Sequence, residues 1–269
     1  MSGPIALSEI NPSEAVEVLN PDGQGGFVLI CEHASNRIPA ALNRLGLSDE
    51  ALSSHIAWDP GARAVAATLS RDLDAPLVAA GMSRLIYDCN RPPHADSAMP
   101  ARSEATDIPG NAGLDHPARL ARTLAVYGPF RDGVADTLDR ALAMGRLPLV
   151  LTIHSFTPVY LGRRREVDIG ILHDSDSRLA DAMLQVAAED DEAATLRICR
   201  NEPYGPADGV THTLALHAVP RGLPNVMIEI RNELLADSEG RDRIAALLAR
   251  LARGASAILS RQPALDKAG

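Results

Sequence analysis

The fold of this chain is constrained most by the alternation of short apolar runs with longer stretches of helical periodicity. The apolar runs span residues 27–33, 75–81, 84–90, 147–155, 167–174, 195–201 and 225–232. Several of them lack a strict apolar–polar alternation, which is typical of strands covered on both faces. Helical patterns span residues 60–73, 116–144, 177–189 and 240–260. The alternation predicts an α/β fold with a largely parallel sheet.

The domain organisation is expected to be simple, because no linker divides the 269 residues. We expect a leader with one short helix at residues 1–25 and a single domain over residues 26–262. Pro129 is expected to break or kink the helical pattern that contains it. The longest stretch without predicted structure is 91–115, and a loop of that length in a compact domain is often functional.

Composition excludes several classes of protein. A net charge of −9 argues against a general nucleic-acid-binding surface. The first 25 residues contain neither a basic region nor an apolar core of a signal peptide, and no run reaches transmembrane length. Three cysteines lie in apolar runs without CxxC spacing, which favours reduced, buried thiols. We therefore expect a soluble, cytoplasmic protein without nucleic-acid or membrane partners.

Four of the apolar runs end in polar, reactive side chains. In open α/β sheets, ligands bind at the carboxyl ends of the strands, so parallel strands would bring these groups to one edge. The groups are Glu32-His33, Asp88 to Arg91, His154-Ser155 and Glu229 to Asn232.

His33 and His154 are candidate metal ligands. A lone histidine is more often a structural residue, but two histidines at separate strand ends favour a shared ion. Neutral imidazole suits zinc, and a catalytic zinc takes three protein ligands. The chain has no HExxH helix, so such a site must be assembled from distant segments.

Glu229 and Arg91 each allow two interpretations. Glu229 lies in the apolar run VMIEI, where it is either paired with an arginine such as Arg231 or acts as a general base. Arg91 follows Asn90, and an arginine can bind a carboxylate through two parallel hydrogen bonds. That carboxylate belongs either to a substrate or to the protein itself, with Asp88 as a candidate.

Taken together, these motifs resemble the N-formylglutamate amidohydrolase family over residues 27 to 235. The matching stretches are CEHASNRIP, HIAWDPGA, SRLIYDCNRPP, IHSFTPVYLGRRREVDIGIL, NEPYGPADGVTHTL and MIEIRNEL. The family is distantly similar to the zinc carboxypeptidases and aspartoacylases. This implies one mixed, mostly parallel sheet flanked by helices, of the phosphorylase/hydrolase-like type.

The resemblance also implies an activity. It points to a zinc-dependent hydrolase that converts N-formylglutamate to formate and glutamate, in histidine degradation, with one zinc ion per chain and a small carboxylate as substrate. His33 and His154 match the zinc histidines, Asn90-Arg91 matches the pair that binds the substrate carboxylate, and Glu229 matches the general base.

The third metal ligand is left open by the sequence. The zinc carboxypeptidases carry the pattern HxxE, and here the fourth position is Asn36, a neutral amide and a poor zinc ligand. Asp59 and Glu32 are the carboxylate candidates. We favour Asp59, whose alternative role is the N-cap of the helix at 60–73. Glu32 adjoins His33, and adjacent strand side chains point to opposite faces.

Two arginines complete the predicted site. Arg84 is expected to stabilise the oxyanion in the substrate complex, and Arg164, within a run of three arginines, to bind a second substrate carboxylate. Other N-acyl amino acids, a peptide-like amide, or a binding role without catalysis are the alternatives. The oligomeric state is open, with a homo-oligomer among the options.

Overall fold

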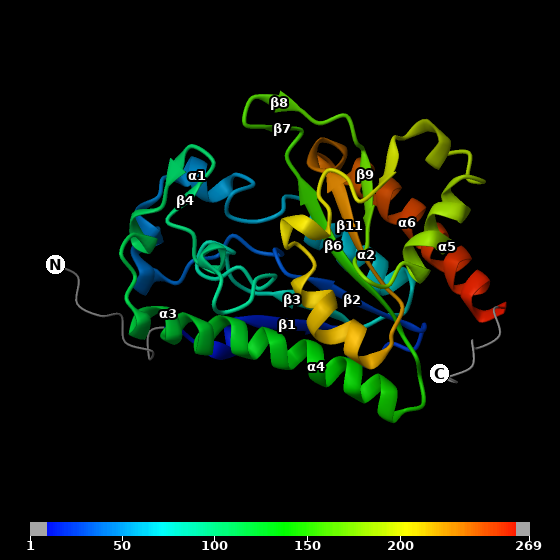
Figure 1. Ribbon diagram of the computed structural model, residues 1–269, viewed down its shortest axis with the longest axis horizontal. Coiled ribbons are helices and arrows are strands. Elements are labelled where there is room, and N and C mark those ends of the chain that lie inside the picture. The colour runs from blue at the N-terminus through cyan, green and yellow to red at the C-terminus, as the bar shows by residue number, and fades with distance from the viewer. Residues whose placement is uncertain (1–9, 262–269) are drawn as a thin grey trace.

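A seven-stranded sheet forms the centre of the computed structural model, which describes residues 10–261 (Figure 1). The strand order is β1-β3-β2-β6-β11-β9-β10. The strands are β1 (Val16–Leu19), β2 (Phe27–Cys31), β3 (Leu77–Ala80), β6 (Leu149–Phe156), β9 (Ile169–Leu172), β10 (Ile198–Arg200) and β11 (Asn225–Arg231).

Four neighbouring strands, β3, β2, β6 and β11, run parallel to one another. The edge strand β1 is antiparallel to β3, and β9 is antiparallel to β11 but parallel to β10. The sheet is therefore mixed and mostly parallel, as predicted. Its four parallel strands deliver their carboxyl ends to a single edge, which is where an open α/β sheet places a ligand.

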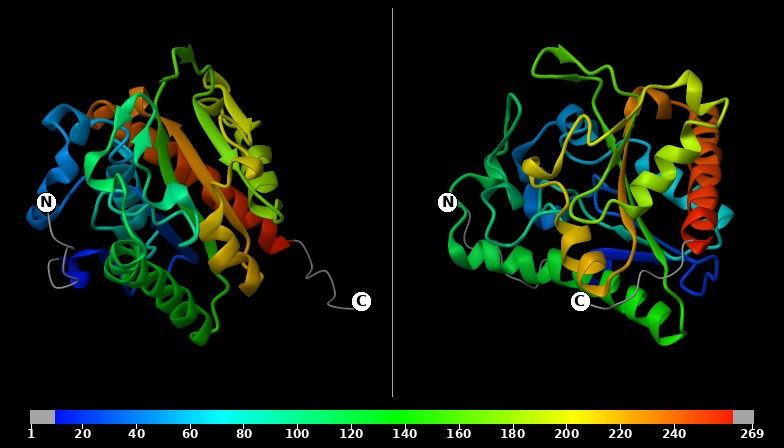
Figure 2. Two further views of the ribbon diagram at one scale, coloured as in Figure 1. Left: turned by 60° about the vertical axis from the view of Figure 1, so that its left-hand side comes forward. Right: turned by 45° about the vertical axis from the view of Figure 1, so that its right-hand side comes forward.

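Helices cover both faces of the sheet (Figures 1 and 2). One face, here called the helix face, packs against α2 (Ala62–Asp72), α5 (Arg178–Ala187) and α6 (Ser238–Arg261). The other, the loop face, packs against α4 (Gly128–Ala143) and the segment 82–115. Shorter elements are α1 (Asp49–Ser53), α3 (His116–Arg122) and two hairpins, β4 (Arg102–Ser103) with β5 (Thr106–Asp107) and β7 (Val159–Tyr160) with β8 (Arg163–Arg164).

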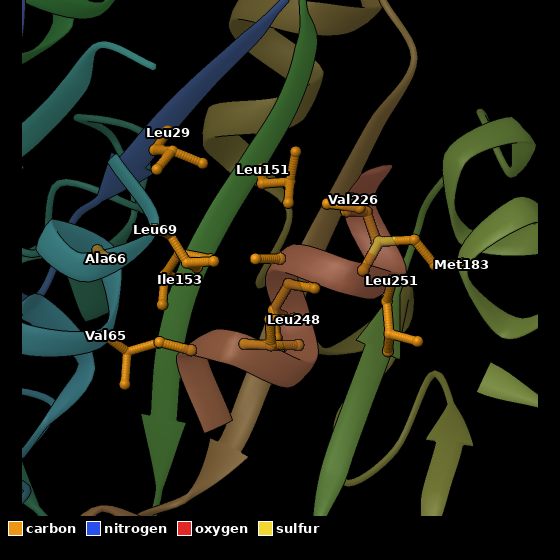
Figure 3. Packing of buried hydrophobic residues seen from close by; sticks show 14 of the residues in the cluster. Leu29, Val65, Ala66, Leu69, Leu151, Ile153, Met183, Val226, Leu248 and Leu251 are labelled. Atoms are coloured by element: carbon orange, nitrogen blue, oxygen red, sulfur yellow. The ribbon is translucent and has the colours of Figure 1, made fainter. Parts of the chain in front are cut away.

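Strand alternation assigns each side chain to one of the two faces. In β6, Leu151 and Ile153 belong to the core of the helix face, together with Leu248 of α6 (Figure 3). Val150 of the same strand belongs to the core of the loop face. Because successive strand residues point to opposite sides, His154 follows Val150 onto the loop face.

The helix predicted to be interrupted at Pro129 continues through that residue. Pro129 is the second residue of α4 and lies inside a helical segment that runs without a break from α3, so it lacks the N–H that an interior helical residue would donate to the preceding turn. A π-helical turn, Thr123–Tyr127, joins α3 to α4 directly before it. The local change in helix geometry therefore precedes the proline.

Two predictions about the elements are wrong. Residues 84–90 form turns, although Leu85, Ile86 and Tyr87 are buried in the core of the loop face. Their apolar character reflects packing over the sheet, without pairing in it. In the predicted leader, Val16–Leu19 is a strand that pairs with β3, while residues 1–9 lie outside the described part. The other six predicted strands and all four helical regions are confirmed.

Candidate metal and catalytic site

Three buried side chains from distant segments converge at the carboxyl edge of the parallel strands. His33 follows β2, His154 lies on β6, and Asp59 lies in the turn before α2. The two Nδ1 atoms are 3.2 Å apart, and the Asp59 Oδ2 atom lies 3.2 Å from His33 Nδ1 and 2.9 Å from His154 Nδ1. Such a group of donors could bind a metal ion.

The local structure holds these three donors together. β2 and β6 are adjacent and parallel, so His33 and His154 emerge from neighbouring strands. The backbone N–H of Asp59 donates to the carbonyl of His33 at 3.0 Å, which attaches the turn to the end of β2. The N–H of Ser155 donates to Asp59 Oδ2 at 3.2 Å and orients the carboxylate.

Each imidazole has a second carboxylate on its far side. His33 Nε2 lies 2.8 Å from Asp88 Oδ1, and His154 Nε2 lies 3.0 Å from Glu32 Oε2. The second contact has the distance of an ion pair without the direction of a hydrogen bond. Metal-binding histidines usually turn their other nitrogen to a carboxylate in this way.

The positions of the two Nδ1 atoms and the Asp59 oxygen show whether these three ligand atoms fit a cation. When the proton of each imidazole is on its Nε2 atom, both Nδ1 lone pairs face the Asp59 oxygen. Three such donors within 3.2 Å repel one another unless a proton or a metal ion lies between them. Two imidazole nitrogens and a carboxylate oxygen are also a ligand set that zinc takes in hydrolases. The residues therefore fit a divalent metal ion.

The pKa values of His154 and Asp59 also indicate that this cluster favours a bound cation. Burial lowers the pKa of His154, but Glu32 and Asp59 outweigh it and hold that pKa well above its ordinary value. Burial raises the pKa of Asp59, but His33 and His154 outweigh it and hold that pKa well below its ordinary value. The centre attracts positive charge, so binding of a metal ion would release protons.

Arg84 joins the cluster from the segment after β3. Its Nη2 atom lies 2.6 Å from Asp88 Oδ2, and its Nη1 atom lies 3.5 Å from Asp59 Oδ1. Burial raises the pKa of Asp88, but Arg84 and His33 outweigh it, and the net pKa is well below its ordinary value. Asp88 is therefore an anion that connects Arg84 to His33.

A cavity of about 270 Å³ opens over this centre. Glu229 of β11 lines it and is the register partner of His154 on β6. Burial raises the pKa of Glu229 to about 7, despite the opposing effect of His154. A carboxyl group with such a pKa can accept and return a proton near neutral pH.

Two further predicted residues line the cavity, with different surroundings. The Asn90 side chain accepts from the N–H of Thr213 at 3.0 Å and donates to the carbonyl of Val210 at 2.5 Å, so it holds the segment 210–213 in place. Arg91 donates to the carbonyl of Asn90 at 2.8 Å. Within residues 10–261, no carboxylate lies within ion-pair distance of the Arg91 guanidinium, which leaves its charge available to a ligand.

Arg164, Asn36 and Glu32 lie apart from the three converging donors. Arg164 is exposed on β8, does not line the cavity, and has its Nη2 atom 3.5 Å from Glu233 Oε2. The Asn36 side chain donates to the carbonyl of Leu52, away from the cluster. Glu32 lies behind His154, on its Nε2 side.

The proposed alternative role of Asp59 as a helix cap is wrong. The helix α2 begins at Ala62, and its N-cap is Gly61, with a φ of 83°. A Cβ at Gly61 would lie 2.5 Å from the Leu235 Cβ atom, so this turn has no room for a larger residue. The carboxylate of Asp59 does not cap this helix, because the N-cap is Gly61, and it points to the two histidines.

Sequence reasoning missed one pair of cavity residues. His55, after α1, and Glu104, in the turn between β4 and β5, both line the cavity with a distance of 2.5 Å between Nε2 and Oε1. The two residues are far apart in the sequence and neither follows an apolar run. No signal in the sequence could have brought them together.

The fold and these side chains define an α/β protein whose polar cavity has the groups of an amidohydrolase, with a centre that could hold a metal ion. The chain belongs to the N-formylglutamate amidohydrolase family, whose family model matches residues 25–236.

Two solved structures are similar to this chain. The gene product Atu2144 from Agrobacterium tumefaciens is 55% identical, with a TM-score of 0.90 over 94% of this chain and 100% of that one. An N-formylglutamate amidohydrolase from Ralstonia eutropha JMP134 is 18% identical, with a TM-score of 0.61 over 92% of this chain and 99% of that one, and supports the fold alone. A comparison with curated proteins gave no significant match.

None of the helices within residues 10–261 combines sufficient length with sufficient apolar character to cross a bilayer.

Proposed function

We propose that this protein is a zinc-dependent amidohydrolase that cleaves the amide bond of an N-acyl amino acid, with N-formylglutamate as the leading substrate. The observation that carries the proposal is the convergence of His33, Asp59 and His154 beside the buried Glu229 in one cavity. Membership of the N-formylglutamate amidohydrolase family supports the substrate class.

His33 Nδ1, His154 Nδ1 and Asp59 Oδ2 would hold the ion, one per chain. The chemistry that zinc supplies when bound is acidification of a water molecule and polarisation of a carbonyl group. Asp88 orients the His33 imidazole through a hydrogen bond, and Glu32 places a negative charge behind the His154 imidazole.

Glu229 is the group that moves the proton. Its carboxylate accepts a proton from the attacking water and then gives it to the leaving nitrogen of the amide. A carboxyl group with an ordinary pKa would be a weaker base, and burial supplies the increase to about 7.

Two arginines of the cavity have separate tasks. Arg91 has no carboxylate partner among the described residues and binds a carboxylate of the substrate. Arg84 is fixed by Asp88 and lies beside Asp59, where its charge stabilises the anionic oxygen that develops at the acyl carbon. Asn90, next to Arg91, holds the segment 210–213 in place and acts by positioning it.

The test is hydrolysis by the purified protein before and after removal of metal. We expect release of formate and glutamate from N-formylglutamate, loss of that activity after treatment with a chelator, and recovery with about one equivalent of zinc. N-acetylglutamate, N-succinylglutamate, N-formylaspartate and a formylated peptide provide the comparison. Undiminished turnover in metal-free protein would refute the zinc mechanism, and a preference for another acyl group would replace the formyl substrate.

A further inference from the structure

A second chain segment approaches the sheet beside Glu229. In the antiparallel pairing of β9 with β11, Gly170 is the register partner of Glu229, so the two positions share the loop face. A Cβ atom at Gly170 would lie 2.0 Å from the carbonyl oxygen of Glu202. Only glycine permits this approach, which brings the backbone before Tyr204 against the sheet next to Glu229.

The same segment is attached to the sheet by its own hydrogen bonds. The backbone N–H of Asn201 donates to the carbonyl of Ile171 at 3.1 Å. Its side-chain oxygen accepts from the N–H of His173 at 2.9 Å. The backbone leading to Tyr204 is therefore held at a definite position along β9.

The Tyr204 ring is fixed from its other side by Arg165. The guanidinium carbon of Arg165 lies 4.6 Å from the centroid of the Tyr204 ring, 4.7 Å from that of Tyr160 and 5.5 Å from that of Phe156. Guanidinium groups at such distances attract aromatic faces. All three aromatic residues line the cavity, so one cation joins the end of β6, the β7–β8 hairpin and the Tyr204 segment into a single wall.

We propose that the Tyr204 hydroxyl is a catalytic group that donates a hydrogen bond to the acyl carbonyl oxygen of the substrate as negative charge develops there. The inference rests on the proposed function, because it assigns a further donor to the same reaction. Its ground is the placement of Tyr204 in the wall of the cavity beside Glu229, by the close approach at Gly170 and the contact with Arg165.

The chemistry of the hydroxyl agrees with this assignment. Burial and the neighbouring Glu229 outweigh the opposing effects of Arg165 and Arg84 and raise the pKa of Tyr204 to about 12. The hydroxyl therefore keeps its proton at neutral pH and acts as a donor. A donor of this kind assists most when the oxygen it meets becomes more negative in the transition state, which predicts an effect on kcat larger than that on KM.

The experiment compares Tyr204→Phe with Tyr160→Phe in the full-length, zinc-loaded protein. Both variants keep an aromatic ring beside Arg165 and lose only a hydroxyl. For Tyr204→Phe we expect a decrease of about 100-fold in kcat with KM changed less than about threefold. Zinc content, melting temperature and glutamate affinity measured by calorimetry should match those of the wild type. Tyr160→Phe should retain kcat within about threefold.

The possible outcomes separate this inference from the proposed function. A wild-type protein without activity on any N-acyl amino acid refutes the proposed function. An active wild type with an equally active Tyr204→Phe variant refutes only the role of Tyr204. An increase in KM or a loss of glutamate affinity, with kcat preserved, also overturns the inference, because the hydroxyl would then bind a carboxylate.

Discussion

The imidazole rings of His33 and His154 meet edge to face, with centroids 4.8 Å apart, ring planes at 72° and Nδ1 atoms 3.2 Å apart. Their other nitrogens face two different carboxylates, Asp88 and Glu32. The two rings thus come from separate strands and direct the lone pairs of their Nδ1 atoms at one point. The Asp59 Oδ2 atom is the third ligand atom at that point. This relationship determines how the site should respond to metal and to substitution.

Metal-free protein should bind about one equivalent of zinc and gain stability from it. Because the ion binds the folded state, an excess of 100 times Kd should stabilise the fold by about 2.7 kcal/mol. His154→Ala should lose this gain, as measured by metal titration and thermal unfolding. His55→Ala is the matched control, since His55 lines the same cavity but pairs with Glu104. Equal zinc binding by both variants would contradict the assigned ligands.

Asp88→Asn should weaken zinc binding by about 10–100-fold, because it removes the anion behind His33. A competition titration with a coloured chelator measures the change. Asp107→Asn provides the control, because Asp107 pairs with Arg102 of the cavity lining at 3.1 Å without contacting the histidines. Zinc affinity in that variant should equal that of the wild type, and a loss of similar size in both would show that the effect is unspecific.

Glu229→Gln should retain zinc yet lose about 10²–10⁴-fold in kcat, because glutamine cannot accept the proton of the attacking water. Formate release under saturating substrate measures kcat, and elemental analysis measures the metal. In the wild type, activity should decline as the pH falls through the pKa of Glu229, because the base becomes protonated. A variant as active as the wild type would remove Glu229 from the mechanism.

The same substitution should stabilise the metal-free protein at high pH. The pKa of Glu229 is about 7 in the folded protein, above its value in the unfolded chain, so the folded state binds the additional proton. The contribution of Glu229 to the free energy of unfolding is fully present below the pKa that it has in the unfolded chain. It is lost as the pH rises from there through about 7. Relative to the wild type, Glu229→Gln should gain up to about 3 kcal/mol between pH 4 and pH 8. Urea unfolding at both pH values measures the difference, and a constant difference would contradict the raised pKa.

Arg91→Ala should raise KM for N-formylglutamate by about 10–100-fold, the effect of losing a hydrogen-bonded charge pair with the substrate carboxylate. Arg164→Ala should leave KM within about twofold, because Arg164 is exposed and faces Glu233 outside the cavity. Steady-state kinetics of the two variants provides the comparison. The opposite result would restore Arg164 as the carboxylate-binding residue.

The sequence was sufficient to predict the groups whose position follows from strand order. His33 and His154 lie at the ends of apolar runs and Glu229 lies near the end of one, and parallel strands carry such residues to one edge of the sheet. The histidines and Asp59 are indeed neighbours in the structure, whereas their roles stay predictions. Asp59 could not be chosen over Glu32 with certainty from its spacing, since both are carboxylates near an imidazole.

The remaining differences arise where the position of a residue depends on tertiary packing. Residues 84–90 read as a strand because Leu85, Ile86 and Tyr87 are apolar, yet burial over a sheet requires the same side chains as pairing within it. Arg164 and Arg165 are adjacent in the sequence, and only the hairpin geometry decides which contacts the aromatic wall. Local periodicity contains no information on either choice.

The division of each strand between two faces has a consequence for how this family can change. In β6 and β11, the residues that carry chemistry alternate with residues that only pack against helices, as His154 and Ile153 do. Evolution can therefore exchange the packing residues for others of similar volume without touching the catalytic groups. An insertion or deletion of one residue within β6 would instead turn His154 toward α2 and replace it with an apolar neighbour. Divergent members should therefore differ by substitution in these strands and by length only in the loops between them.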